Sequence, residues 1–299
     1  MSFKSGFIAI IGRPNAGKST LLNALLEEKI AIISPKPQTT RNNIQGILTT
    51  EDAQYIFIDT PGIHKPKHEL GKNMNKGAFS SMQDVDVIYM LKDASMPFGS
   101  GDEFLLDKLK NVDAPVFLIL NKCDLLKPEQ IFKLLEEWNT RYDFAELIPL
   151  SAVNGKNLTE LLNTTKQYLS EGMQFYPEEM KSDRSDDFRI RELIREKVLY
   201  RTNEEVPHSI AVVIENKEES ESKVYIQAVV IVERDSQKGI LIGKQAKMIK
   251  SIKLAAQKDI KEMLGKKVEL ELYVRVEKHW RDRTSKLNQL GYSDSGEYE

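Results

Sequence analysis

A glycine-bounded loop near the N-terminus has the composition of a phosphate-binding site. It runs from Gly12 to Ser19 with the sequence GRPNAGKS, after the apolar stretch Phe7–Ile11 and before a leucine-rich segment. A strand, such a loop and a helix in this order bring backbone N–H groups and the positive end of the helix onto one anion. Lys18 is expected to reach the terminal phosphates and Ser19 to ligate Mg²⁺. The residues expected to contact phosphate are Gly12, Asn15, Ala16, Gly17, Lys18, Ser19 and Thr20.

A carboxylate follows a second apolar stretch. Residues 54–58 predict a short strand, and the sequence Asp59-Thr60-Pro61-Gly62 comes directly after it. Ligands of open α/β sheets bind at the carboxyl ends of the strands. We expect Asp59 to hold Mg²⁺ through water and the Gly62 amide to meet a γ-phosphate. Taken alone, Asp59 is equally consistent with a turn cap.

Two further loops carry groups suited to a guanine base. The predicted strand 116–120 runs into Asn121-Lys122-Cys123-Asp124, and the predicted strand 147–150 runs into Ser151-Ala152. A carboxylate at Asp124 accepts two hydrogens from N1 and N2 of guanine, which adenine does not offer, and the amides of Ser151 and Ala152 are expected to donate to O6. Each residue alone also fits an ordinary polar loop. The predicted guanine-binding residues are Asn121, Lys122, Asp124, Ser151 and Ala152.

These four sequences together resemble the G1, G3, G4 and G5 motifs of the TRAFAC GTPases: GxxxxGKS, DTPG, NKxD and SA. The resemblance implies a G2 threonine in a mobile loop, which the stretch Gln38-Thr39-Thr40-Arg41 supplies. We favour Thr40 over Thr39, because relatives keep the threonine just before the arginine. The resemblance thus implies Ser19, Thr40 and Asp59 as the Mg²⁺ site. The implied catalytic residues are Lys18, Thr40, Asp59 and Gly62.

Two positions indicate how hydrolysis proceeds. Ras-like enzymes carry a water-orienting glutamine directly after the DxxG motif, whereas this chain has Ile63. A slow intrinsic GTPase is therefore expected. Asn15 matches the asparagine that helps to bind K⁺ in TrmE-Era-type GTPases, where the ion takes the charge role of an arginine finger. The alternative is that Asn15 only packs within its loop.

Composition favours an intracellular protein with two domains. The chain has 299 residues, a net charge of −2 and one cysteine, so an internal disulfide framework is excluded. The first apolar stretch begins at Phe7, which leaves no room for a secretory signal, and no apolar run approaches the ~20 residues of a membrane span. We expect a cytoplasmic protein, with peripheral contact at the inner face of the cell membrane left open.

A polar stretch separates two regions of different pattern. The first region predicts an α/β fold of the P-loop NTPase kind, a mostly parallel sheet with helices on both faces. The second predicts a helix (188–200), strands (209–215 and 224–232), a glycine-containing loop, a helix (245–264) and a strand (268–276). The expected organisation is a GTPase domain at 1–173, a linker at 174–187, a second domain at 188–283 and a C-terminal tail at 284–299.

The second region is basic in its later part. Residues 234–286 contain 15 Lys and Arg against 7 Asp and Glu, a local charge of +8 that leaves −10 for the remainder. This asymmetry indicates a polyanionic partner. On charge alone, a solvated lysine face on an ordinary helix is equally consistent.

The sequence from Gly239 to Ala246 favours a polyanionic partner over a merely solvated lysine face. A glycine loop ahead of a lysine-bearing helix lets the backbone approach a nucleic-acid strand, and KH domains clamp about four nucleotides with a GxxG loop of this kind. The element order and the Ile-Gly-Lys sequence resemble an α+β type II KH domain, although Ala246 stands where the second glycine is usual. The resemblance implies RNA contacts from Ile242, Gly243, Lys244, Gln245, Ala246, Lys247 and Lys250.

A GTPase domain of this type followed by a KH domain resembles the bacterial ribosome-assembly GTPases. That resemblance covers nearly the whole chain. It implies a monomeric switch protein with GTP as substrate and Mg²⁺ and K⁺ as cofactors. It also implies binding of 16S rRNA near its 3′ end, coupled to the nucleotide state, in small (30S) ribosomal subunit biogenesis. Two alternatives stay open: a metabolic P-loop kinase, and a GTP-gated protein or membrane adaptor without a specific RNA target.

Overall fold

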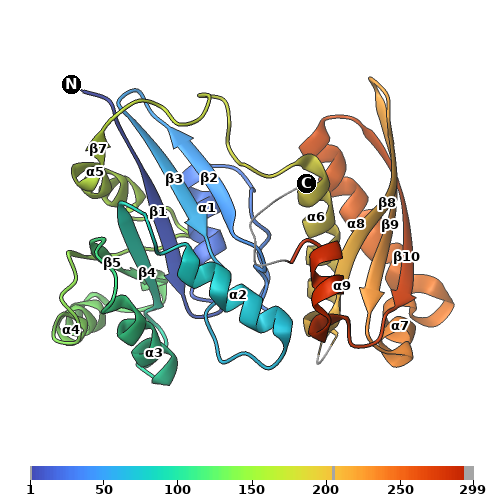
Figure 1. The fold of residues 1–299 in the computed structure, drawn as a ribbon, viewed down its shortest axis with the longest axis horizontal. Helices are drawn as coiled ribbons and strands as arrows, with labels where there is room; N and C mark the ends of the chain where they lie inside the picture. The colour runs from blue at the N-terminus through green and yellow to red at the C-terminus, as the bar shows by residue number, and fades with distance from the viewer. Residues whose placement is uncertain (1, 204–205, 293–299) are drawn as a thin grey trace. The chain divides into compact units, whose positions relative to one another are not determined.

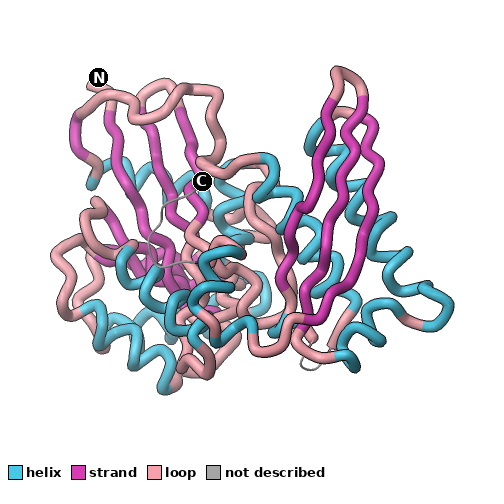
Figure 2. The backbone as a smooth tube through the Cα atoms, turned by 45° about the vertical axis from the view of Figure 1, so that its right-hand side comes forward, coloured by secondary structure: helices cyan, strands magenta, loops and turns pink. Residues whose placement is uncertain are grey.

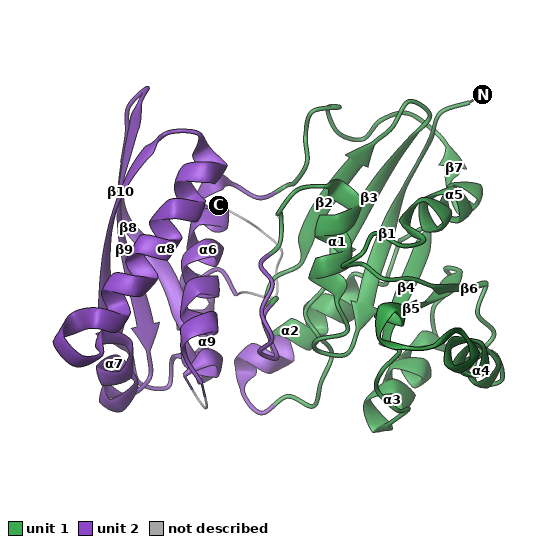
Figure 3. Ribbon diagram, turned by 180° about the vertical axis from the view of Figure 1, so that it is seen from behind, with its two compact units in different colours: residues 1–31, 40–66, 74–183 green, residues 32–39, 67–73, 184–299 purple. Residues whose placement is uncertain are grey.

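The structure is a computed structural model that describes residues 2–203 and 206–292. The chain divides into two compact units (Figure 3). Unit 1 is made of residues 1–31, 40–66 and 74–183, and unit 2 of residues 32–39, 67–73 and 184–299. Of the expected tail, residues 293–299 lie outside the described residues.

Unit 1 is built around a sheet that has seven strands within the described residues, in the order β2-β3-β1-β4-β5-β6 with β7 paired to β1 (Figure 1). β2 is antiparallel to β3 and β7 to β1, whereas all other neighbours are parallel. The central strands β4 and β5 are buried along almost their whole length, as expected for a parallel sheet covered on both faces. The strands are β1 (Lys4–Gly12), β2 (Ile44–Thr49), β3 (Ala53–Asp59), β4 (Val87–Asp93), β5 (Val116–Asn121), β6 (Glu146–Pro149) and β7 (Ser170–Glu171).

Helices pack on both faces of this sheet. On one face, Ala9 and Ile11 of β1 share a core with Leu105 and Trp138, which come from α3 and α4. On the other face, a hydrogen bond between the hydroxyls of Thr165 and Tyr89 joins α5 to β4. The expected fold class of this region is confirmed. The helices are α1 (Lys18–Leu26), α2 (Glu69–Ser80), α3 (Ser100–Leu109), α4 (Pro128–Asn139) and α5 (Leu158–Tyr168).

Much of the expected linker belongs to unit 1. The Ile47 amide donates to the Lys181 carbonyl at 2.9 Å, and the Tyr176 hydroxyl donates to Gln45 Oε1 at 2.8 Å. Ser182 forms a bridge with Gly46 on the edge strand β2. The sequence has few apolar groups here, and it is backbone hydrogen bonding to an open sheet edge that fixes the segment.

Unit 2 contains a three-stranded sheet in the order β10-β9-β8, seen as the second group of magenta strands in Figure 2. β9 and β10 are parallel and β8 and β9 antiparallel, with a bulge between Ile214 and Asn216. Alternate residues of β9 share a core with α6 and α8. The elements are α6 (Asp186–Arg201), β8 (Ala211–Glu219), β9 (Lys223–Val232), α7 (Asp235–Ile242), α8 (Lys247–Leu264), β10 (Lys267–Val276) and α9 (Thr284–Gln289).

Two features of unit 2 differ from the sequence-based expectation. The glycine-containing loop is mostly the helix α7, because Gln237 Oε1 accepts the N–H groups of Glu233 and Arg234 and so caps the helix start. Buried Leu241 adds packing that outweighs the low helix propensity of Gly239. The expected tail also begins as α9, and its Leu287 is fully buried.

Candidate functional site

The nucleotide motifs meet at one edge of the unit 1 sheet. The loop Gly12–Ser19, here called the phosphate loop, follows β1, and Asp59 is the last residue of β3. Asn121 ends β5, and Ser151 comes shortly after β6. Because these strands are parallel, their carboxyl ends lie along the same edge, where α/β sheets bind ligands.

Lys18 lies inside the phosphate loop. Its Nζ donates to the carbonyl oxygens of Gly12 at 3.3 Å and Arg13 at 3.2 Å. Burial lowers the pKa of Lys18 to about 8, and the nearby Asp59 charge opposes that shift. Gly17 has φ of 99°, and a Cβ there would lie 2.3 Å from Asn121 Nδ2, so only glycine fits.

Three oxygen-bearing side chains converge beside Lys18. Ser19 Oγ lies 2.6 Å from Asp59 Oδ2 and 2.8 Å from Thr40 Oγ1. Burial raises the pKa of Asp59 to about 6, against the Lys18 charge and the Ser19 and Thr40 hydrogen bonds. Asp59 Oδ1 is buried and has no hydrogen-bond partner within the described residues.

This set fits Mg²⁺. Magnesium prefers oxygen ligands and usually binds through one or two carboxylates, with waters and substrate phosphates completing its shell. Among residues 2–203 and 206–292, no three His, Cys, Asp or Glu side chains form a metal-binding group. A single carboxylate with two hydroxyls therefore suits an ion that the phosphates of a nucleotide help to hold.

The two adjacent threonines of the G2 stretch have different surroundings. Thr40 is buried, with its hydroxyl directed at Ser19 and Asp59. The Thr39 hydroxyl instead donates to the Lys36 carbonyl at 2.7 Å, within its own loop. The structure thus brings Thr40, and not Thr39, into the oxygen cluster.

The glycine of the DTPG motif packs against the phosphate loop. A Cβ on Gly62 would lie 2.8 Å from the backbone N and Cα of Pro14, so a larger residue would displace the loop. The Ile63 amide donates to the Gly12 carbonyl at 3.2 Å, and the Ile63 side chain is buried in the core of unit 1. Ile63 therefore offers no side-chain group to an attacking water.

Asn121 and Lys122 connect the loops around the site. Asn121 Nδ2 donates to the Ala16 carbonyl at 2.9 Å, and its Oδ1 accepts the Ala152 amide at 3.1 Å. Lys122 Nζ donates to the Asn15 carbonyl at 2.9 Å and pairs with Asp93 at 2.6 Å. These two residues of the NKxD motif thus link the phosphate loop to Ala152 after β6 and to Asp93 at the end of β4.

The carboxylate of Asp124, predicted to bind guanine, is exposed and its orientation is fixed by a hydrogen bond. Asp124 Oδ1 accepts a hydrogen bond from Ser151 Oγ at 2.6 Å. The Ser151 amide donates to the Lys156 carbonyl, and the Ala152 amide donates to Asn121. Both amides thus already have acceptors, which differs from their expected use as donors to guanine O6.

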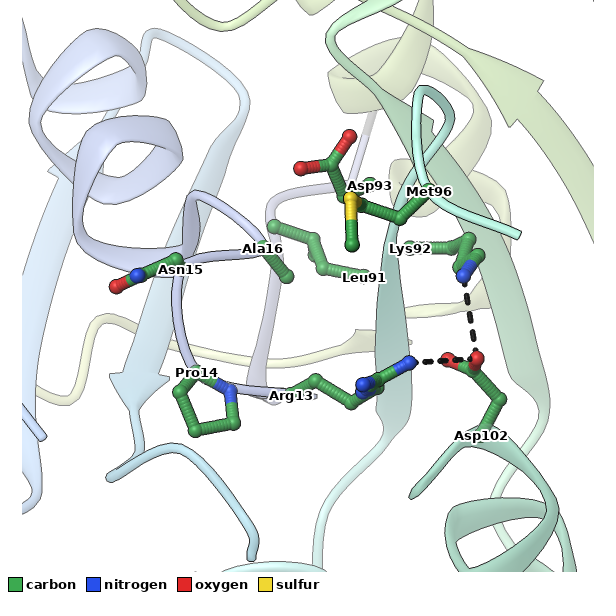
Figure 4. Close-up of a pocket in the computed structure, with 9 residues that line it drawn as sticks. All are labelled: Arg13, Pro14, Asn15, Ala16, Leu91, Lys92, Asp93, Met96 and Asp102. Atoms are coloured by element: carbon green, nitrogen blue, oxygen red, sulfur yellow. Dashed lines mark hydrogen bonds and ion pairs between the residues drawn. The ribbon is translucent and has the colours of Figure 1, made fainter. Parts of the chain in front are cut away.

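Sequence reasoning missed Asp93, Lys92 and Asp102, which lie beside the phosphate loop (Figure 4). Asp93 is the last residue of β4 and pairs with Lys122. The signal that identified Asp59, a carboxylate at the end of an apolar strand, was present for Asp93 too. No local pattern marks Asp102, which comes from α3 and reaches the loop only through folding.

In unit 2 the predicted RNA-contact residues lie between α7 and α8. Gly243, Gln245 and Ala246 all have positive φ, at 69°, 52° and 59°. A Cβ on Gly243 would lie 2.7 Å from Met248 Cβ, so this glycine is required. The side chains of Lys244, Gln245, Lys247 and Lys250 are exposed, whereas those of Ile242 and Ala246 are half-buried.

Within the described residues, no helix combines the length and the apolar character needed to cross a bilayer.

Comparison with known proteins agrees with both parts of this description. Residues 7–122 match the family described as 50S ribosome-binding GTPase, and residues 205–281 match the KH domain. A crystal structure of Era with MgGDPNP and nucleotides 1506–1542 of 16S ribosomal RNA is 38% identical, with a TM-score of 0.95, covering 97% of this chain and 99% of that chain. A variant of Aquifex aeolicus Era bound to GDP and AlF4⁻ is 38% identical, with a TM-score of 0.94, covering 97% of this chain and 100% of that chain.

Proposed function

The chain belongs to the Era family of GTPases, and we propose that unit 2 binds 16S rRNA near its 3′ end with an affinity set by the nucleotide in unit 1. Support comes from the solved Era complex, which contains nucleotides 1506–1542 of 16S rRNA and MgGDPNP. In this chain the exposed lysines around Gly243 provide the cationic surface. The biological role proposed is assembly of the small (30S) ribosomal subunit.

GTP hydrolysis uses the residues gathered at the edge of the unit 1 sheet. Mg²⁺, when bound, would supply positive charge against the phosphate oxygens. Ser19, Thr40 and Asp59 provide the oxygen atoms that would hold it, and Lys18 places a cation against the terminal phosphates. Because Ile63 is buried and apolar, no side chain at that position orients the attacking water, and the intrinsic rate is slow.

One observation carries the proposed coupling between nucleotide state and RNA affinity. The segment Ile32–Thr39, which directly precedes Thr40, belongs to unit 2. Ile32 lies in the core that α6 and α8 form. The Ile33 amide donates to Glu196 Oε1 at 3.1 Å, and the Thr39 carbonyl accepts from the fully buried guanidinium of Arg195. Thr40, the next residue, carries the hydroxyl of the oxygen cluster.

The contacts continue from α6 to the lysine-bearing helix. Lys197 Nζ donates to Glu196 Oε2 at 2.9 Å and also pairs with Asp259 of α8. A nucleotide that changes the position of Thr40 moves the segment that α6 holds, and α6 is tied to α8. Coupling then requires that the segment has two arrangements, and that GTP and GDP stabilise these arrangements to different extents.

A second segment of unit 2, Lys67–Asn73, follows the DTPG motif in sequence. His68 Nδ1 lies 3.2 Å from Asp282 Oδ1, and Asn73 Nδ2 donates to the Tyr292 carbonyl at 3.0 Å. Both loops that a γ-phosphate orders in GTPases therefore continue into segments of unit 2.

The test is RNA affinity of the full chain with GDP and with a non-hydrolysable GTP analogue. The probe is a labelled RNA with the sequence of 16S nucleotides 1506–1542. We expect different Kd values in the two states, and E196Q should bring them closer together. Y200F is the matched control, since Tyr200 is an exposed residue on the same helix. Equal affinities in the two states would reject the coupling, and no binding in either state would reject the RNA target.

The finer assignments belong to the same proposal. They are a monomer in the cytoplasm, a K⁺ role for Asn15, and contact with the inner face of the cell membrane. The basic part of unit 2 is the surface that would meet anionic lipid. If the protein is an adaptor instead, RNase treatment leaves its co-purifying partner in place.

A further inference from the structure

A partly buried ion cluster lies beside the phosphate loop (Figure 4). Asp102 Oδ2 accepts from Arg13 Nη1 at 3.0 Å and from Lys92 Nζ at 3.1 Å. The side chains of Lys92 and Asp102 are 3% and 2% exposed, whereas that of Arg13 is 39% exposed. Arg13 is the second residue of the phosphate loop, and its carbonyl accepts from Lys18 and from the Ala16 amide.

The start of α3 is shaped to receive Arg13. Asp102 Oδ2 also accepts the Gly99 amide at 3.0 Å, which fixes the carboxylate at the helix N-terminus. A Cβ on Gly101 would lie 2.9 Å from Arg13 Nε and 3.2 Å from Arg13 Cδ. The absence of a side chain at Gly101 therefore makes room for the arginine.

Asp93, the residue of β4 after Lys92, helps to hold the phosphate loop at a second point. Lys92 contacts Asp102, and the next residue, Asp93, pairs with Lys122, which donates to the Asn15 carbonyl. The end of β4 thus fixes the loop at two positions, one on each side of Pro14. These ties set where the amides of the loop point.

Packing contributes little on this side of the loop. A cavity of about 320 Å³ lies between the phosphate loop and the end of β4. Atoms that line a cavity lack packing partners on that side. The Arg13 side chain is therefore positioned by its ion pair with Asp102 and by its close contact with Gly101 of α3.

We propose that Asp102 is a positioning residue for nucleotide binding and GTP hydrolysis, acting through Arg13. Asp102 touches no substrate in this role. It holds the Arg13 side chain against α3 and so keeps the phosphate-binding amides aimed at the β- and γ-phosphates. This inference rests on the GTPase activity and is independent of the RNA target.

The test compares R13Q, D102N and the double variant in the full chain, with D107N as control. Asp107 is also on α3 but pairs with Lys110 at the surface, with 64% of its side chain exposed. Release of fluorescent GDP should be about tenfold faster in R13Q, as expected for the loss of a hydrogen bond between charged groups. D107N should match the wild type.

The double variant distinguishes positioning from simple stability. D102N also leaves buried Lys92 without its anion, so a lower Tm is expected for D102N and not for R13Q. If Asp102 acts through Arg13, the double variant releases GDP no more than about threefold faster than D102N. R13K, which keeps a cation at this position, should release GDP at a rate closer to the wild type than R13Q does. Multiplying effects in the double variant would overturn the proposal, as would wild-type GDP release and hydrolysis by R13Q.

Discussion

Ala246 provides a sharp test of the KH loop. Its φ of 59° lies in the left-handed region, which costs an L-residue with a Cβ roughly 1–2 kcal/mol. Glycine removes that strain but loses about 0.5–1 kcal/mol more backbone entropy on folding. Ala246→Gly should therefore stabilise unit 2 by about 0.5–1 kcal/mol.

The assay uses the position of the two tryptophans. Trp138 is buried in unit 1 and Trp280 in unit 2. In a W138F background, Trp280 fluorescence reports urea unfolding of unit 2 alone, and the background cancels in the comparison. K258G, at an exposed position inside α8, is the control with the opposite sign, since glycine destabilises a helix interior by about 0.5–1 kcal/mol.

RNA affinity provides the second measurement on Ala246→Gly. The clamp approaches RNA through its backbone, so a relaxed loop should bind at least as tightly as the wild type. A lower affinity, or a less stable unit 2, would refute the argument from φ.

The remaining predictions concern the two sites. D124N should shift base choice from GTP to XTP. GTP binding should be about a hundredfold weaker, because the carboxylate that accepts two hydrogen bonds from guanine is lost. Competition binding with GTP and XTP measures the shift. T40A should lower Mg²⁺-dependent hydrolysis at least about tenfold, whereas T39A should lower it little; equal losses would contradict the geometry. Replacing NaCl with KCl should speed hydrolysis, and equal rates would remove the K⁺ role. K244A/K247A should flatten the slope of log Kd against log salt by about 1.4, since each phosphate contact on a single strand contributes about 0.7.

The local sequence pattern was sufficient to predict a helix or strand wherever that element buries one regular face. Strand β10 and helix α8 were predicted within two residues of their observed bounds. Gly265 ends α8 with φ of 64°, and its amide donates to the Lys261 carbonyl. Such elements follow from side-chain period and a glycine cap, which need no knowledge of distant residues.

Prediction failed where backbone or side-chain bonds from elsewhere decide the outcome. Helix α7 forms because Gln237 caps its start and Leu241 is buried in the core, although Gly239 suggested a loop. The polar residues after Phe175 follow the edge strand β2, because an open sheet edge offers hydrogen bonds that composition does not reveal.

The GTPase chemistry was readable from the chain itself, because each motif is a short run of residues that can be recognised without any distant partner. The choice between Thr39 and Thr40 rested on resemblance to relatives and not on the sequence alone. In the structure the hydroxyl of Thr40 contacts Ser19, whereas that of Thr39 contacts the Lys36 carbonyl. Asp102 became visible only after folding, since its partner Arg13 lies 89 residues earlier. A buried charge is recognised by what surrounds it, and that environment exists only in three dimensions.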